Sequence, residues 1–193
     1  MLMAGQPASA SSILIDFEHL PGADGVLGTL DDTPTGGREI EALSDQFAAL
    51  GVTFSQGSLF NYQLFSVDGS SHFISSSYPI ASFSVPVYGI SIQSKSFWDA
   101  TLTAYDADGK VLAAQTLKGN GQFNLGTISV SSARAISSFS VMPDNPNHIL
   151  NLDNLSLETS PAPVPEPFSY VMLAAGGLLL AGQRRRACRL KQA

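Results

Sequence analysis

The sequence has almost no cysteine and few basic residues before its C-terminal end. Its only cysteine is Cys188, so the chain cannot close a disulfide within itself and core packing must hold the fold. All sixteen Asp and Glu residues lie at or before Glu166, together with only five of the ten Lys and Arg residues. Five bases against sixteen acids leave this part with a net charge of about −11, which repels nucleic acid. We therefore expect no nucleic-acid partner.

Catalytic and zinc-binding patterns are also missing. The three histidines, His19, His72 and His148, stand apart in the sequence, and no serine lies in a nucleophile-elbow motif. With one cysteine and no close pair of histidines, the sequence lacks the ligand spacing of a zinc site. A carboxylate pair for glycoside cleavage stays open, because sequence does not show separation in space. Nothing in the sequence favours an enzyme.

Long hydrophobic runs are absent except near the C-terminus, where residues 168–183 contain no charge. A proline-rich stretch over residues 159–167 precedes this run, and a basic tail over residues 184–193 follows it. The order predicts a C-terminal transmembrane helix whose basic end is cytoplasmic. The run is sixteen residues long, shorter than the ~20 of a relaxed bilayer span, so it suits a transient anchor. The basic residues that would stop the helix are Arg184, Arg185, Arg186, Arg189 and Lys191.

This arrangement resembles the PEP-CTERM sorting signal of exported bacterial proteins. The motif residues are Val164, Pro165, Glu166 and Pro167, followed in order by the apolar run and the basic cluster. The resemblance implies that an exosortase-type protease cuts the chain near this motif while the precursor is held transiently in the inner membrane. It also implies a periplasmic ectodomain that is then delivered to the cell surface or to the extracellular polysaccharide matrix.

The N-terminus has no basic segment and no apolar core long enough for a signal peptide. Ala8-Ser9-Ala10 nevertheless has the small-x-small form of a signal-peptidase site. We expect residues 1–12 to be the remnant of a signal peptide or a disordered N-terminus, with the true start upstream.

Residues 13–158 read as one domain of short strands. Residues 13–18 alternate between apolar and acidic side chains after the first residues, which predicts the first strand. Residues 83–92 predict one or two strands interrupted or edged by Pro86, and residues 125–130 and 135–141 predict two more. A hairpin is expected around the turn at residues 106–109, closed by Gly109. Residues 40–50 have helical spacing and predict the one short helix outside the tail. Such regular short strands with Gly and Asn turns predict an all-β, antiparallel, jelly-roll-like β-sandwich.

The order of the strand segments from residue 13 to residue 158 resembles that of the ectodomains that often accompany PEP-CTERM tails. These are similar in shape to carbohydrate-binding modules. The resemblance implies a jelly-roll sandwich with a structural or adhesive role, or alternatively a module that binds exopolysaccharide, and it carries no catalytic residues across.

Acidic and amide side chains on the first and last strands form a possible calcium site. In a jelly roll these strands lie close together, so Asp16 or Glu18 can converge with Asp153 and Asn154. Calcium takes six to eight oxygen ligands, mainly carboxylates and carbonyls. The alternative is that these side chains simply face solvent or form hydrogen bonds at strand ends.

Sugar recognition would use an aromatic ring with a polar edge, and Trp98 is the only tryptophan. It lies between Phe97 and Asp99, so a carboxylate is adjacent to the ring. The competing interpretation is that Trp98 fills the core of the sandwich. These two interpretations predict different exposures for the indole.

Overall fold

The structure is a computed structural model that describes residues 11–35, 40–61, 72–76, 78–119, 121 and 124–160. The chain divides into two compact units, Met1–Ala162 and Pro163–Ala193. The second unit lies outside the described residues, as do the predicted sorting motif, the apolar run, the basic tail and residues 1–10.

Strands dominate the described part of the chain, with one short 3-10 helix. In chain order the elements are β1 (Ser12–Ile15), β2 (His19–Leu20), β3 (Thr33–Pro34), β4 (Ile40–Ala42), η1 (Ala48–Leu50), β5 (Val52–Gln56), β6 (Ser58–Asn61), β7 (His72–Ser76), β8 (Ile80–Ser96), β9 (Ala100–Tyr105), β10 (Val111–Leu117), β11 (Asn124–Pro143) and β12 (Leu150–Glu158).

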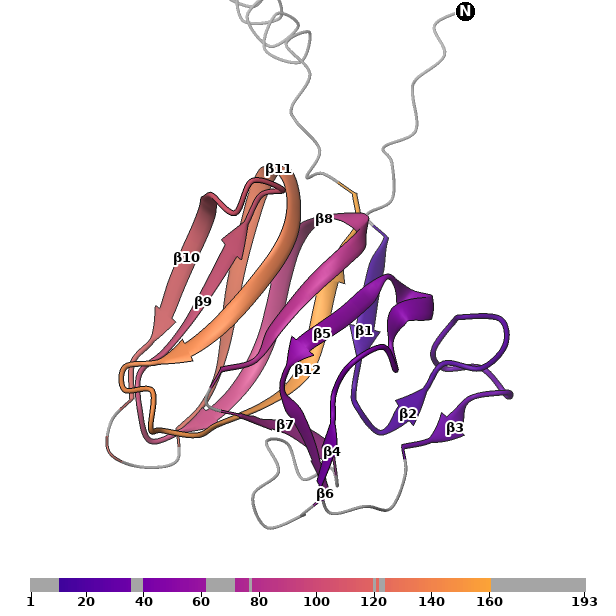
Figure 1. Cartoon of the computed structure of the whole chain (residues 1–193), viewed down its shortest axis with the longest axis horizontal. Coiled ribbons are helices and arrows are strands. Elements are labelled where there is room, and N and C mark those ends of the chain that lie inside the picture. Colours follow the sequence, from indigo (N-terminus) through magenta and orange to yellow (C-terminus); the bar gives the residue numbers. More distant parts are fainter. Residues whose placement is uncertain are drawn as a thin grey trace, which may run out of the picture. The chain divides into compact units, whose positions relative to one another are not determined.

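The two longest strands, β8 and β11, each take part in both layers of the sandwich (Figure 1). The two strands are antiparallel, so the second half of β8 pairs with the first half of β11, with Ile92 opposite Ile128. The first half of β8 pairs with the second half of β11, with Ser82 opposite Ser138. Pairing is irregular between Ser131 and Ser138, where the ladder shifts register. Such irregularities let a strand bend, so one continuous antiparallel sheet folds over on itself.

The halves of β8 and β11 recruit different neighbours. The first half of β8 pairs with β5, and the second half of β11 pairs with β9, which carries β10 at its edge. The second half of β8 pairs with β12, which in turn pairs with β1 and with the run β7, β6 and β4. Within the described residues the fold is thus all-β, antiparallel and sandwich-like, as predicted.

The core lies between the two layers. Alternate residues of β9, namely Ala100, Leu102 and Ala104, are fully buried, as the period of a half-buried strand requires. At one end the rings of Phe17, Phe47 and Phe54 pack edge to face, with the centroids of Phe17 and Phe47 5.5 Å apart. Phe17 takes a left-handed backbone (φ 62°), and β1 ends at Ile15 just before it.

The predicted helix over residues 40–50 is wrong. Its beginning is strand β4, which pairs with β6, and only Ala48–Leu50 form a single 3-10 turn. Between them the side chain of Gln46 accepts a hydrogen bond from the amide of Ser44 at 2.6 Å. Such local bonds compete with helix formation, and a segment this short depends on tertiary packing for its conformation.

Of the one or two strands predicted over residues 83–92, the structure has one, β8, and the two strands predicted over residues 125–130 and 135–141 are a single strand, β11. Pro86 lies within β8, between the residue that pairs with β5 (Phe83) and the one that resumes pairing with β11 (Val87). Proline has no amide hydrogen, so it fits the interval where the ladder is interrupted. The hairpin at residues 106–109 is confirmed, with Gly109 at φ 75°.

None of the helices in the described part of the chain is long and apolar enough to cross a membrane. The predicted transmembrane segment, residues 168–183, belongs to the second unit and lies outside the described residues.

Candidate functional site

A pocket of about 420 Å³ lies where β6, β7 and β12 meet two loops, the one between β8 and β9 and the one between β11 and β12. Its lining combines aromatic rings with amide and hydroxyl groups. We call it the Trp98 pocket, and its lining residues are Phe60, Phe73, Ser75, Phe97, Trp98, Asn147, His148, Ile149 and Asn151.

The indole of Trp98 is the largest aromatic side chain in the lining of this pocket. It is 43% exposed, so it does not fill the core. The imidazole of His148 stacks on it, with ring centroids 3.7 Å apart and planes inclined by 10°. The ring of Phe97 lies further away, at 6.4 Å and an angle of 46°. The two loops are therefore joined through a face-to-face contact of their rings.

Hydrogen bonds fix the turn that presents Trp98. Its amide donates to the hydroxyl of Ser96 at 3.0 Å. The carboxylate of Asp99 accepts hydrogen bonds from the ammonium of Lys118 and from the amide of Gly119, the latter at 2.9 Å. The hydrogen bond from Lys118 lowers the pKa of Asp99 most, and the hydrogen bond from the amide of Gly119 lowers it further. The hydrogen bond to Asp99 in turn raises the pKa of Lys118.

Gly119, which follows the end of β10, allows the chain to pass close to the turn that carries Trp98. A β-carbon at this position would lie 2.4 Å from the carbonyl oxygen of Phe97 and 2.6 Å from the carbonyl carbon of Trp98. Only a residue without a side chain fits there.

The loop between β11 and β12 holds His148 in a similar way. The imidazole Nδ1 of His148 lies 3.0 Å from a carboxylate oxygen of Asp144, and the His148 amide donates to the carbonyl of Asn145 at 2.9 Å. The amide of Asp144 donates to the carbonyl of Asp99 at 3.1 Å, which ties this loop to the Trp98 turn. The stack is thus supported by backbone and side-chain bonds on both sides.

Phenylalanine rings and polar side chains complete the pocket. Phe73 on β7 is buried and its ring lies 5.9 Å from that of Phe60 on β6. Beside them the hydroxyl of Ser75 donates to the side-chain oxygen of Asn151 at 3.3 Å. The pocket therefore offers flat apolar surfaces next to hydrogen-bonding groups, which is the usual composition of a small-ligand site.

The residues predicted to hold calcium fall into one region of the sheet. β1 pairs with β12 from Leu155 onward and β7 pairs with it up to Leu152, so Asp153 and Asn154 lie between these two stretches. The register shifts there and Asn154 has φ 50°, which defines a β-bulge. Asp153 is completely buried, and its carboxylate accepts a hydrogen bond from the Asn154 amide at 2.7 Å.

Asp16 and Glu18 follow the end of β1 and already have protein donors. The amide of Glu18 donates to Asp16 at 3.0 Å, and the imidazole of His19 lies 3.8 Å from Asp16. Glu18 accepts a bond from the amide of His72 at 2.7 Å and hydrogen-bonds to its Nδ1 at 2.8 Å. Within the described ranges no group of three or more His, Cys, Asp or Glu side chains is arranged to hold a metal. Calcium binding stays a prediction.

Sequence reasoning identified Trp98 but none of the other residues that line its pocket. His148 stands alone in the sequence, and only the fold of the sandwich brings its ring to Trp98. The tyrosines Tyr78 and Tyr88, whose rings could also stack on a sugar, do not line the pocket, and Tyr62 lies outside the described residues.

No protein-family model and no curated protein matches this chain by sequence. Among solved structures it is similar to a cleaved adhesin domain of Lys-gingipain from Porphyromonas gingivalis, with 12% identity over 78% of this chain and 99% of that one, at a TM-score of 0.43. It is also similar to CsCBM6-3 from Clostridium stercorarium in complex with cellobiose, with 12% identity over 50% of this chain and 80% of that one, at a TM-score of 0.35.

A third similar structure is an arabinose-bound α-L-arabinofuranosidase, with 17% identity over 64% of this chain and a TM-score of 0.41. The chain spans only 27% of that enzyme's length. At these identities and TM-scores the comparisons assign neither a family nor a ligand to the chain.

Proposed function

We propose that the chain is a non-catalytic, exported protein of the cell surface or extracellular matrix whose β-sandwich adheres to exopolysaccharide through the Trp98 pocket. The observation that carries this proposal is the partly exposed indole of Trp98 in a pocket of about 420 Å³. This volume is within the range of small-ligand sites.

The chemistry of the pocket suits a sugar ring. A pyranose has an apolar C–H face and a rim of hydroxyls, so it stacks on an aromatic plane and exchanges hydrogen bonds at its edge. Trp98 supplies the plane, and Asn147, Asn151 and Ser75 supply donors and acceptors beside it. The stack with His148 holds the indole in place before a ligand binds. Less side-chain entropy is therefore lost on binding.

The lining of the pocket favours binding over catalysis. Glycoside cleavage uses two carboxyl groups that flank the scissile bond. The described lining residues include no Asp or Glu, and the nearby carboxylates of Asp99 and Asp144 are engaged with Lys118 and His148. We therefore assign adhesion rather than hydrolysis to this pocket.

The route to the cell surface is proposed from the sequence alone. The motif Val164, Pro165, Glu166 and Pro167, the apolar run and the basic residues from Arg184 to Lys191 would direct the precursor to an exosortase-type protease. Mass spectrometry of surface material should find peptides of residues 13–158 and none of residues 168–193. Recovery of the intact C-terminal peptide from that material would contradict processing.

Affinity electrophoresis tests the function of the sandwich. The full chain should migrate more slowly in gels that contain the producing cell's exopolysaccharide than in gels without it, and should release no reducing ends from that polymer. Unchanged migration would contradict glycan binding, and released reducing ends would indicate an enzyme instead.

A further inference from the structure

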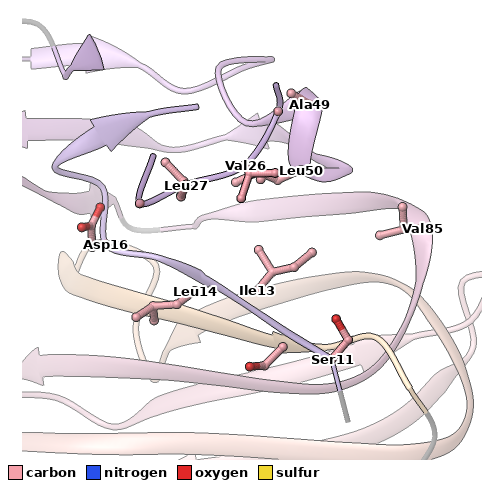
Figure 2. Close-up of a pocket in the computed structure, with 12 residues that line it drawn as sticks. Ser11, Ile13, Leu14, Asp16, Val26, Leu27, Ala49, Leu50 and Val85 are labelled. Atoms are coloured by element: carbon pink, nitrogen blue, oxygen red, sulfur yellow. The ribbon is translucent and has the colours of Figure 1, made fainter. Parts of the chain in front are cut away.

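A second pocket, a groove of about 670 Å³, runs beside β1, between this strand, the loop after β2 and the η1 turn (Figure 2). Figure 2 shows Ile13 on β1 pointing toward Val26 and Leu50, with Val85 of β8 at one end of the groove. The lining is mostly aliphatic. We call it the β1 groove, and the aliphatic side chains that line it are Ile13, Leu14, Val26, Leu27, Leu50 and Val85.

Apolar side chains in this groove are exposed to solvent. Leu14 is 55% exposed and Val26 is 53% exposed, whereas Ile13 and Leu27 of the same lining are partly buried and pack against the hydrophobic core. Neighbouring exposed aliphatic side chains of this kind mark an interaction surface more often than isolated ones do.

The groove also follows a sheet edge. Among the described strands β1 pairs only with β12, with Ile13 opposite Leu157, and its other edge has no strand partner. β7, β6 and β4 continue the sheet beyond β12 only at the other end of that strand. An exposed strand edge of this kind accepts an extended peptide, whose backbone continues the ladder while its alternate side chains enter pockets.

One acidic side chain lines the groove, and others lie on the elements next to it. Asp16 is part of the lining, and Glu158 lies on β12 opposite Ser12 of β1. Among the described residues the lining contains no Lys or Arg, and the imidazole of His19 lies 3.8 Å from Asp16. The charge on this rim therefore favours a basic partner.

The loop that forms the far wall of the groove is held in shape by a carboxylate. Asp32 accepts hydrogen bonds from the amides of Gly22, Gly28 and Thr29 at 3.2, 2.6 and 3.0 Å. Desolvation by the surrounding loop raises the pKa of Asp32, but the hydrogen bonds from the amides of Gly28, Thr29 and Gly22 outweigh it, so the pKa is lowered and this carboxylate stays ionised at neutral pH. The wall is therefore preorganised and adds a further negative charge near the groove.

We propose that the β1 groove docks an extended, basic segment of a partner protein, which adds as a strand to β1 and inserts alternate aliphatic side chains between Ile13 and Val26. β1 is four residues long, so the pairing would extend over about 13 Å. An acyl chain would also suit the aliphatic lining, but its carboxylate or phosphate headgroup would meet the acidic rim. The charges therefore favour the basic peptide.

Fluorescence anisotropy with a labelled peptide tests this docking on the full chain. The probe is a peptide in which valine and threonine alternate between two pairs of lysines. Its matched controls are the same peptide with glutamates in place of the lysines, and the same peptide with alternate backbone nitrogens methylated so that it cannot continue a ladder. The lysine peptide should bind saturably, and each control peptide should bind about tenfold more weakly or worse.

A pair of valine variants locates the binding. Val26→Lys places a repelling charge in the groove and should weaken binding about tenfold. Val111→Lys changes a valine of nearly equal exposure, 52%, on β10, which is also an edge strand, and should leave binding unchanged. Circular dichroism and the melting temperature establish that both variants are folded; if Val26→Lys does not fold, the three peptides compared on the unaltered chain decide the question.

Several results would overturn the proposal. These are no binding of the lysine peptide, equal binding of the methylated or glutamate peptide, a loss of binding in Val111→Lys but not in Val26→Lys, or saturable binding of laurate that displaces the peptide. None of them bears on the Trp98 pocket, because the two pockets share no residue.

Discussion

Trp98 and His148 stack face to face, with ring centroids 3.7 Å apart, although they belong to two different loops of the chain. The contact joins the turn after β8 to the loop before β12 and forms one wall of the Trp98 pocket. Since Trp98 is the only tryptophan, its fluorescence reports on this wall alone.

His148→Ala should release the indole of Trp98 from this stack. We expect its emission maximum to move to longer wavelength and its quenching by acrylamide to increase, because the covered ring face becomes wet. Aromatic pairs contribute about 0.5–1.5 kcal/mol, and we expect the lower end here because the indole is partly exposed. His19→Ala, which alters a half-exposed histidine outside the pocket, is the control and should leave the emission unchanged. Identical spectra for His148→Ala and the unaltered chain would contradict the stack.

The Asp99 carboxylate should make the stability of the Trp98 turn depend on acidity. Its pKa is lowered below the ordinary 3.8 by the bond from Lys118, so its stabilising effect is present above about pH 4 and is lost as pH falls further. Asp99→Asn should therefore be less stable than the unaltered chain at pH 7, and the difference should shrink below pH 4. Urea unfolding over this pH range measures the difference, with Asp108→Asn on an exposed turn as control. A difference that does not change with pH would contradict the assignment.

Phe17→Ala should be the most destabilising of these substitutions. Its ring is fully buried against Phe47 and Phe54, so its removal leaves a cavity and should lower the free energy of unfolding by about 3–5 kcal/mol. Val111→Ala, which truncates a half-exposed side chain, should change it by no more than about 0.5 kcal/mol. Equal effects of the two substitutions in urea unfolding would show that Phe17 does not hold the core.

Calcium binding at Asp16, Glu18, Asp153 and Asn154 can be tested by titration. If the ion binds there, calorimetry should detect heat, and calcium at about one hundred times its Kd should stabilise the fold by about 2.7 kcal/mol. Asp16→Asn should weaken the stabilisation by calcium. Asp108→Asn changes an aspartate outside the predicted site and should leave that stabilisation unchanged. The absence of both heat and a melting shift would rule the site out.

Much of the fold follows from period-two patterns in the sequence. The alternation in residues 100–105 and the glycine at 109 determine the hairpin of β9 and β10, because a half-buried strand and a tight turn each impose a local requirement. The continuity of β8 through Pro86 was not predictable in this way. It depends on where the partner strand resumes pairing, which is a property of the folded sheet.

The candidate site was predictable only in its central residue. A single tryptophan next to an acid draws attention to Trp98, but its partners Asn151, Ser75 and His148 are ordinary residues of strands and loops. They meet because β12 pairs with both β7 and β8, and long-range pairing of this kind leaves no mark in a local pattern. The helical spacing over residues 40–50 misled for the same reason, since β4 is fixed by pairing with β6.

The most direct test of glycan binding at Trp98 is a fluorescence titration of the full chain with oligosaccharides released from the exopolysaccharide. Because the chain has one tryptophan, we predict a saturable change in its emission at the concentrations where calorimetry detects binding. A chain that binds the oligosaccharides in the calorimeter without any change in Trp98 emission, or that does not bind them at all, would contradict the proposed role of the Trp98 pocket.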